Sequence, residues 1–183
     1  MVEEYNDRTV DVEYDEVPDI PEYLERVMLE ALEEGKKYIL GKQMLVPFTL
    51  LAIKDSLFLE THPGDSAEDC FALAKHTVEG ARGADAYAFC YDGYVDTDDG
   101  MKDCIIAEGA TPGASDGYAI GYLYEVEEES GIVVVEADPA YIGEAPNFMK
   151  DLCDSSVYAE DDIDPRYLSG EGFEDGGSVI VEE

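Results

Sequence analysis

The sequence predicts an α+β domain built on a mainly antiparallel sheet, and three observations lead to this class. Two segments carry apolar residues at the three- and four-residue spacing of amphipathic helices. About six shorter segments alternate or cluster apolar residues and are separated by turn-forming residues. Strand and helix do not alternate often enough for a parallel Rossmann sheet. We therefore expect five to six strands with two helices packed on one face, in the order αββαββββ.

The first helix is predicted to begin at Pro21. The fixed φ of proline suits a first helical turn, and Asp19 is placed to act as the N-cap. Gly35 and the two lysines after it suggest the end of the helix, since cations favour the C-terminal end of the helix dipole. The apolar stripe between these limits consists of Leu24, Val27, Met28, Ala31 and Leu32.

Two strands and a second helix are predicted next. Residues 45–53 and 57–61 form a hairpin, and Pro47 is tolerated only near the start of a strand or on an edge. Ser66 then opens a helix with Asp69 at the third position of a capping box. Its apolar face consists of Ala67, Phe71, Ala74, Val78 and Ala81.

Four further strands are predicted at residues 84–95, 102–109, 117–126 and 132–137, joined as a meander. The first two form a hairpin across a short acidic turn that ends in Gly100. The third strand places a row of large side chains on one face, namely Tyr118, Ile120, Tyr122, Tyr124 and Val126. We take the hairpin as the element around which the sheet is organised.

The chain divides into a single domain with two acidic ends. Residues 1–19 are predicted to be a solvated tail, with a marginal edge strand at residues 10–14 as the alternative. The α+β domain covers residues 20–147, and residues 148–183 form an acidic, largely irregular tail. The apolar triplet at 179–181 leaves open a second interpretation, in which it docks on a sheet edge or adds a strand to a partner.

The charge of the chain limits its partners. Asp and Glu number 45 against 11 Lys and Arg, which gives a net charge of −34. Such a chain lacks the basic face that binds nucleic-acid phosphates, and it is repelled by anionic membranes. Three interpretations remain: acidity shared by a whole lineage, an acidic surface for a basic partner, or mimicry of DNA charge.

The N-terminal residues and the cysteines indicate a cytoplasmic protein. MVEEYNDRTV is acidic and polar where a signal peptide would be basic and then apolar, and no apolar run reaches the length of a membrane span. The four cysteines lack CxxC spacing, so we expect reduced thiols, three of them buried. A pair between Cys90 and Cys104 would require an oxidising compartment.

No motif predicts a metal or a cofactor. The acids between Asp92 and Gly100 suggest a calcium loop, but counting from Asp96 puts glycine at position 5 and Ala107 at position 12, where an EF-hand needs glycine at 6 and glutamate at 12. His62 and His76 lack metal-ligand spacing, so surface or capping roles are expected for them. P-loop, GxGxxG and GxSxG motifs are also missing.

The candidate site lies on the hairpin. Tyr91, Asp92 and Tyr94 stand near the end of its first strand, and Asp103 and Glu108 stand on the second. Tyrosines are common anchors in interfaces, which favours a binding role. Carboxylates also perform acid–base catalysis, so an enzyme that uses Asp92, Asp103 and Glu108 is the alternative.

Several runs resemble a known pattern: PFTLLAIKDS, GDSAEDCFALAKHTVE, ADAYAFCYDGY, KDCIIAEG, GYAIGYLYE and YIGEAPN. Together they look like a diffuse family of small uncharacterised bacterial α+β proteins, in which a strand closing in Y-D-G pairs with a strand ending near a glutamate. The resemblance covers residues 44–147 and matches Tyr91, Asp92, Gly93, Asp103 and Glu108. It implies no activity.

We expect a protein that binds a partner, in particular a basic protein, through its acidic surface. Self-association through the sheet, which would give a homo-oligomer, is part of the same expectation. The alternatives are the carboxylate enzyme and an acidic DNA mimic that inhibits a nucleic-acid-binding protein. No direct binding of nucleic acid or membrane is expected.

Overall fold

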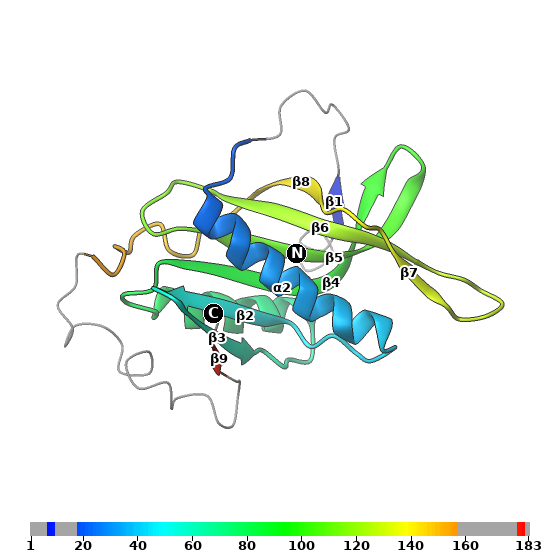
Figure 1. The fold of residues 1–183 in the computed structure, drawn as a ribbon, viewed down its shortest axis with the longest axis horizontal. Helices are drawn as coiled ribbons and strands as arrows, with labels where there is room; N and C mark the ends of the chain where they lie inside the picture. The colour runs from blue at the N-terminus through cyan, green and yellow to red at the C-terminus, as the bar shows by residue number, and fades with distance from the viewer. Residues whose placement is uncertain (1–6, 10–17, 157–178, 182–183) are drawn as a thin grey trace.

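A single, mainly antiparallel sheet runs through the computed structural model, which describes residues 7–9, 18–156 and 179–181 (Figure 1). The sheet has nine strands, and its main path has the order β7-β6-β5-β4-β2-β3-β9. Off this path, β1 pairs with β4 and β8 pairs with β6; the β1–β4 pair is parallel. The strands are β1 (Asp7–Thr9), β2 (Phe48–Ile53), β3 (Ser56–Thr61), β4 (Ala86–Thr97), β5 (Gly100–Ala110), β6 (Gly117–Val126), β7 (Val133–Val135), β8 (Ala140–Ala145) and β9 (Val179–Val181).

The predicted class and the order of the main elements are confirmed. Helix α2 (Glu22–Leu40), the β2–β3 hairpin, helix α3 (Ala67–Glu79) and the meander from β4 to β7 follow one another as expected. The strands that the sequence pattern misses are β1, β8 and β9. β1 and β9 have three residues each, too few to display a period of two, and β8 pairs with β6 through a register shift.

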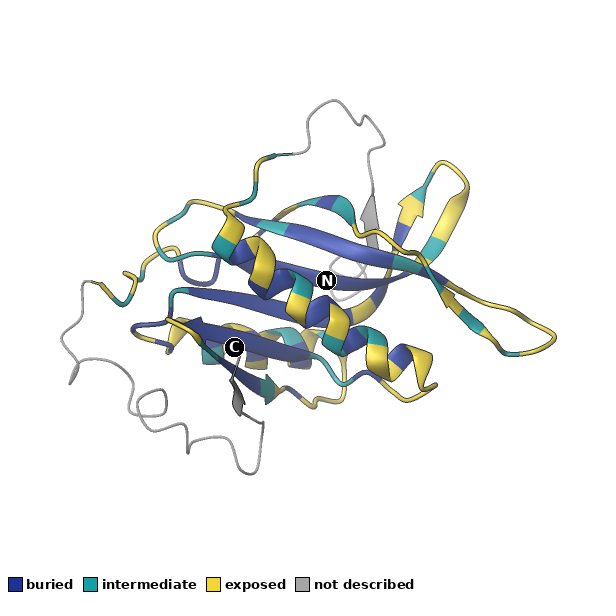
Figure 2. Cartoon of the chain, in the orientation of Figure 1, coloured by how far each residue is buried: buried dark blue, intermediate teal, exposed yellow. Residues whose placement is uncertain are grey.

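The two helices cover opposite faces of the sheet, which corrects the prediction that they share one (Figure 1). Neighbouring residues of β2 show the division, because Leu50 packs in the cluster under α2 whereas Leu51 packs in the cluster with α3. Both faces of the central strands are therefore buried, as the run of buried residues in β2 and β4 requires (Figure 2). Two apolar faces on one sheet need a cover on each side.

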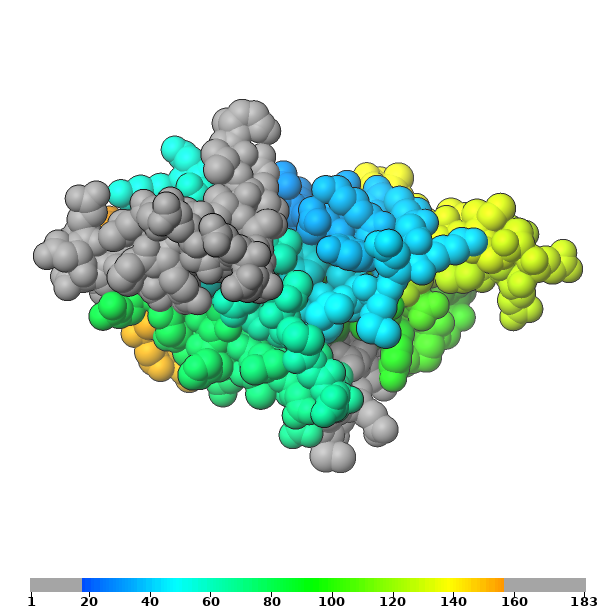
Figure 3. All heavy atoms as spheres, turned by 90° about the horizontal axis from the view of Figure 1, so that it is seen from below, coloured from blue at the N-terminus to red at the C-terminus, as the bar shows by residue number. Residues whose placement is uncertain are grey.

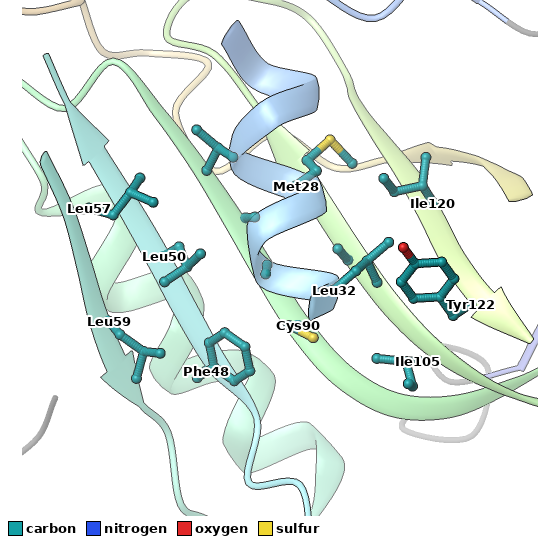
Figure 4. Close-up of a cluster of buried hydrophobic side chains, with 14 of the residues drawn as sticks. Met28, Leu32, Phe48, Leu50, Leu57, Leu59, Cys90, Ile105, Ile120 and Tyr122 are labelled. Carbon is teal, nitrogen blue, oxygen red and sulfur yellow. The ribbon is translucent and has the colours of Figure 1, made fainter. Parts of the chain in front are cut away.

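The α2 side of the sheet is an apolar core. Met28 and Leu32 of α2 lie over Cys90 and Ile105 of the central strands, with leucines of β2 and β3 beside them (Figure 4). The helix approaches closely at Gly35, where an added Cβ would lie 2.9 Å from the Cys90 Sγ. Gly35 thus serves packing within the helix, and α2 continues to Leu40 instead of ending at this glycine.

The predicted N-cap is correct for α3 and wrong for α2. At α3 the Ser66 Oγ accepts a hydrogen bond from the Asp69 N–H at 3.1 Å, which confirms the expected cap. At α2 the capping position is Pro21, which makes no side-chain hydrogen bond, so the prediction of Asp19 as the cap is wrong. The apolar stripe of α2 is nevertheless buried as predicted.

The α3 side of the sheet extends beyond the predicted domain boundary at residue 147. Phe148 and Met149 are buried in the cluster that also contains Tyr87 and Phe89 of β4. The Phe148 N–H donates a hydrogen bond to the Tyr87 hydroxyl at 3.1 Å. The rings of these two residues stack with centroids 5.5 Å apart. Phe148 and Met149 therefore belong to the folded core, because they pack in the α3-side cluster.

Both ends of the chain contribute a strand. β9 pairs with β3, so the alternative in which the 179–181 triplet docks on a sheet edge describes the structure. β1 lies along β4 from Tyr94 to Asp96. The marginal strand proposed at residues 10–14 and most of the predicted C-terminal tail, residues 157–178, lie outside the described residues.

Three of the four cysteines are buried and all four are free, as expected. Cys90 faces α2 whereas Cys104 faces α3, so a cross-strand pair between them is excluded by the fold. Burial raises the pKa of both thiols, with the charge of Asp92 adding to the effect. These cysteines therefore pack as small apolar side chains.

Candidate functional site

The β4–β5 hairpin carries all five candidate residues in one continuous register. Tyr94 pairs with Asp103, and the pairing extends to Thr97 opposite Gly100, so the strands run closer to the turn than predicted. The turn is closed locally by the Thr97 hydroxyl, which donates to the Gly100 carbonyl at 2.8 Å. Its acidic residues are exposed, consistent with a solvated turn.

Tyr91 and Glu108 meet on the α3 side of the sheet. The Tyr91 hydroxyl donates a hydrogen bond to Glu108 Oε2 at 2.5 Å. Both side chains are almost fully buried, with 3% and 2% of their surface exposed. A buried carboxylate is tolerated only when its oxygens are hydrogen-bonded, and the phenol provides one such bond. This pair therefore lies in the core, where it is closed to a partner.

Asp92, Tyr94 and Asp103 lie on the other face, the one that carries α2. Residues that pair directly across strands point to the same side of a sheet. Tyr94, Asp103 and Tyr124 form such a row, because Tyr94 pairs with Asp103 and Asp103 with Tyr124. The Tyr124 hydroxyl donates to Asp92 Oδ1 at 2.6 Å. Three of the predicted residues are thus brought together, with Tyr124 as a fourth member.

The ionisation of this row is shifted by its surroundings. Partial burial raises the pKa of Asp92, the hydrogen bond from Tyr124 lowers it, and the charge of Asp103 raises it. The pKa of Tyr124 is raised by burial first, and then by its hydrogen bond to Asp92. The phenol therefore stays neutral and remains a hydrogen-bond donor to the carboxylate at physiological pH.

The carboxylate enzyme is not supported by this arrangement. It required Asp92, Asp103 and Glu108 to converge in one pocket, whereas Glu108 is buried on the α3 side and the two aspartates are exposed on the α2 side. Strand alternation alone could have shown this division, because Asp103 and Glu108 are five positions apart on one strand and therefore point to opposite faces.

A fork opens beside the row formed by Tyr94, Asp103 and Tyr124. Pairing of β5 with β6 ends at Asp103 and Tyr124, and beyond this point the β4–β5 and β6–β7 hairpins diverge (Figure 1). The space between them is a cavity of about 380 Å³. We call it the fork, and its lining residues are Met101, Lys102, Asp103, Tyr124, Glu125, Val126, Glu127 and Val134. Of these, the sequence interpretation singled out Asp103 as a site residue.

Exposed apolar side chains gather at the fork. Met101, Val126 and Val134 line it with 50%, 49% and 60% of their surface exposed, and Tyr94 beside it is 38% exposed. The β6–β7 hairpin projects from the body of the molecule, so this side is open (Figure 3). In the sequence, the only trace of the fork is that Tyr124 and Val126 continue the apolar alternation of their strand. The structure adds that the neighbouring strand is no longer paired beyond Tyr124.

A second polar cluster lies on the α3 side, and the sequence interpretation missed it. His62, expected at the surface, is buried, and its Nε2 lies 3.0 Å from the Thr49 Oγ1. Its Nδ1 lies 3.9 Å from Glu60 Oε2, which accepts a hydrogen bond from the Thr77 hydroxyl at 2.6 Å. Burial lowers the pKa of His62 to about 4, against a smaller opposing effect of the Glu60 charge.

The His62 cluster resembles the nucleophile–base–carboxylate geometry of hydrolases only in its residue types. Thr49 is completely buried, so its hydroxyl cannot reach a substrate. The backbone explains why His62 turns inward: its N–H donates to the Pro47 carbonyl at 2.7 Å, which continues the β2–β3 ladder one residue further. The cluster therefore satisfies buried polar groups.

Comparison of the chain with protein-family models, with curated proteins and with solved structures found no match. The resemblance to the Y-D-G family accordingly stays a prediction. Over the part of the chain that the structure describes, no helix is long and apolar enough to cross a membrane. Within the same residues, no three His, Cys, Asp or Glu side chains are grouped so as to hold a metal ion.

Proposed function

We propose that this chain is a binding protein that recognises a basic segment of a partner protein at the fork. One observation carries the proposal: Met101, Val126 and Val134 are exposed at the ends of two hairpins whose other residues are largely acidic. Apolar area supplies affinity, and complementary charge supplies steering and selectivity. The fork combines both in one place.

The charge around the fork selects for a cation. Residues 91–103 and 124–138 contain eleven acids and one base. That base, Lys102, is already paired with Glu125 at 2.9 Å. A basic partner segment would therefore meet uncompensated carboxylates, and its attraction would weaken as salt screens them. An acidic or neutral segment would gain no such attraction.

The apolar residues define what else the partner must carry. Met101 and Val126 are separated from the large clusters of the core, so burying them against a partner removes new apolar area from water. Tyr94 adds an aromatic side chain of the kind that dominates interface energetics. A segment that alternates basic and apolar residues fits this surface better than a purely basic one.

The test is a fluorescence-anisotropy titration with a labelled twelve-residue peptide of alternating Lys and Leu. Peptides of alternating Lys and Ser, and of alternating Glu and Leu, serve as probes of charge alone and of apolar content alone. We expect the Lys/Leu peptide to bind at least about tenfold more tightly than either, with an affinity that falls as salt is raised.

Variants locate the binding to the fork. Met101→Ser and Val126→Ser should each weaken binding of the Lys/Leu peptide several-fold, because each removes exposed apolar area. Met44→Ser is the matched control, since Met44 is 84% exposed and does not line the fork. Equal binding of the Lys/Ser peptide, or equal loss in the Met44 variant, would show non-specific attraction to a polyanion and would overturn the proposal.

Compartment and assembly belong to the same proposal. The four free cysteines suit a reducing compartment such as the cytoplasm. Self-association would compete with peptide binding and would appear as concentration-dependent mass in light scattering. The alternative of a DNA mimic stays a prediction, and it requires the Lys/Leu and Lys/Ser peptides to bind alike.

A further inference from the structure

We propose that a second cavity, at the opposite end of the α2 face from the fork, binds a small zwitterion of amino-acid size with an apolar side chain. We call it the turn pocket. It has a volume of about 250 Å³ and lies between the first half of α2 and the β2–β3 turn. Its lining residues are Tyr23, Arg26, Val27, Glu30, Lys54, Asp55 and Leu57.

One face of α2 and one tight turn build the turn pocket. Tyr23, Arg26, Val27 and Glu30 recur at three- and four-residue spacing, so they share a side of the helix. Ile53 pairs with Ser56, which leaves Lys54 and Asp55 as the two turn residues. The cavity volume lies just below that of typical drug-sized ligand sites, which suits a ligand the size of one amino acid.

The turn that carries Lys54 is held rigidly. The Tyr23 hydroxyl donates to the Lys54 carbonyl at 2.9 Å, and the Lys54 N–H donates to Asp85 Oδ2 at 2.8 Å. Asp85 is itself fixed, because its N–H donates to the Ala52 carbonyl at 2.7 Å. Burial raises the pKa of Tyr23 to about 12, so the phenol keeps its proton and remains a donor.

Lys54 occupies a backbone conformation that glycine or asparagine would adopt at lower cost. Its φ is +52°, and a side chain with a Cβ in this region costs about 1 kcal/mol. Lysine is thus a poor choice for the turn alone. Lys42, just after α2, also has a positive φ of +56°, so what distinguishes Lys54 is that it lines the cavity.

The rim of the turn pocket is charge-balanced, which is unusual in a chain of net charge −34. Arg26 and Lys54 supply two cations, and Glu30 and Asp55 supply two carboxylates. Within the described chain, none of these four side chains forms a hydrogen bond or an ion pair. Their charges are accordingly open to a ligand.

The balance of charges points to a zwitterion. A simple anion would be repelled by Glu30, Asp55 and the net charge of the protein, and a simple cation would meet Arg26 and Lys54. A ligand with no net charge is neither attracted nor repelled by the net negative charge of the protein. Its carboxylate can still pair with a cation of the pocket, and its ammonium with a carboxylate. The buried side chains of Val27 and Leu57 offer an apolar surface for the rest of the ligand.

The first test compares ligands by isothermal titration calorimetry on the full chain. Leucine carries both charges and an apolar side chain, whereas N-acetylleucine lacks the cation, leucine amide lacks the anion and glycine lacks the side chain. We expect leucine to bind about tenfold or more tightly than each of the others. Equal binding of N-acetylleucine or of glycine, or no heat of binding with leucine in the tens of millimolar range, would overturn the proposal.

Variants then assign the site. Arg26→Gln and Glu30→Gln should each weaken leucine binding about tenfold, and both positions are exposed, so the fold should persist. Arg82→Gln and Glu79→Gln are matched controls, since both residues are exposed and lie outside the cavity. Loss of binding in these controls would contradict a localised site.

Lys54→Gly separates binding from folding. Glycine relieves the positive φ, so thermal stability should be kept, while the missing ammonium should weaken leucine binding about tenfold. Unchanged leucine binding in a stable K54G protein would overturn the role given to Lys54. None of these measurements involves the fork, so this proposal and the proposed function stand or fall separately.

Discussion

The two faces of the sheet bury different kinds of side chain. Under α2 the cluster is apolar apart from tyrosines, and its polar groups lie at the rim. On the α3 side lie Thr49, His62 and Glu108, which with Asn147 beside Phe148 are the buried polar or charged residues of the described chain. One face is held mainly by hydrophobic burial, whereas the other also depends on hydrogen bonds that must all be made.

Two tyrosine–carboxylate pairs make the contrast concrete. Tyr91 with Glu108 and Tyr124 with Asp92 have hydrogen bonds of similar length, 2.5 and 2.6 Å. The first pair is fully in the core, whereas the second joins the buried Tyr124, which lines the fork, to the exposed Asp92. Burial therefore distinguishes the two pairs: both groups of the inner pair are closed to solvent, whereas the Asp92 carboxylate of the outer pair is exposed.

The largest effect is expected from Glu108→Ala. It removes the acceptor of the Tyr91 hydroxyl and leaves a cavity in a buried network, so the free energy of unfolding should fall by about 3 kcal/mol. Urea unfolding followed by circular dichroism measures this. The control, Glu127→Ala at an exposed position, should change stability by less than about 0.5 kcal/mol. Similar losses in both variants would remove the contrast between the faces.

The next effect is a pH dependence of the free energy of unfolding, which arises from His62 on the α3 side. The pKa of His62 is lowered to about 4 from 6.5 because the imidazole is buried. The unfolded chain thus binds a proton more readily than the folded one. His62 contributes its full stability above pH 6.5 and loses it as the pH falls toward 4, a loss of about 3 kcal/mol.

His62→Gln isolates this effect from the titration of the many carboxylates. The free energy of unfolding should fall less steeply between pH 6.5 and 4 in the variant than in the natural protein. His76→Gln, at an exposed position of α3, should leave the slope unchanged. Parallel slopes for the natural protein and H62Q would show that burial of His62 is not linked to stability.

A smaller effect compares the two tyrosines directly. Tyr91→Phe removes a buried hydrogen bond to the Glu108 carboxylate and should cost about 1–2 kcal/mol, whereas Tyr124→Phe should cost under about 1 kcal/mol because water can bind the exposed Asp92 carboxylate instead. Chemical denaturation of both variants at pH 7 makes the comparison. A greater loss for Tyr124→Phe would reverse the roles assigned to the two pairs.

The smallest effect is expected from Asp92→Asn. The pKa of Asp92 is raised, so its ionised form is disfavoured in the fold and this cost is present above the folded pKa. Asparagine keeps an acceptor for Tyr124 without the charge, and it should stabilise the protein slightly at pH 7. Solvent screening at this exposed position limits the gain to below about 0.5 kcal/mol.

The pH dependence provides the check on Asp92→Asn. The advantage of the variant should shrink as the pH falls below the folded pKa of Asp92, because the natural side chain then also becomes neutral. Asp98→Asn, in the exposed turn of the hairpin, is the control for removing one negative charge. A gain that persists at low pH would point to a cause other than ionisation.

The fold could be predicted where apolar spacing is local. The stripe of α2, the cap of α3 at Ser66 and the meander all follow from residues close in sequence. The end of α2 could not, because Gly35 resembles a helix stop until one sees Cys90 and Ile105 packed against it. The five candidate residues lie on one hairpin, as the strand pattern predicts, but they divide between two faces of the sheet.

The sequence by itself determined the antiparallel α+β class, the acidity and the β4–β5 hairpin, because periodicity and charge are local properties. The tertiary structure decided which face each helix covers, that His62 and Glu108 are buried, and that the strands diverge into the fork. These outcomes depend on contacts between segments distant in sequence, and no local pattern records which partner a residue will meet.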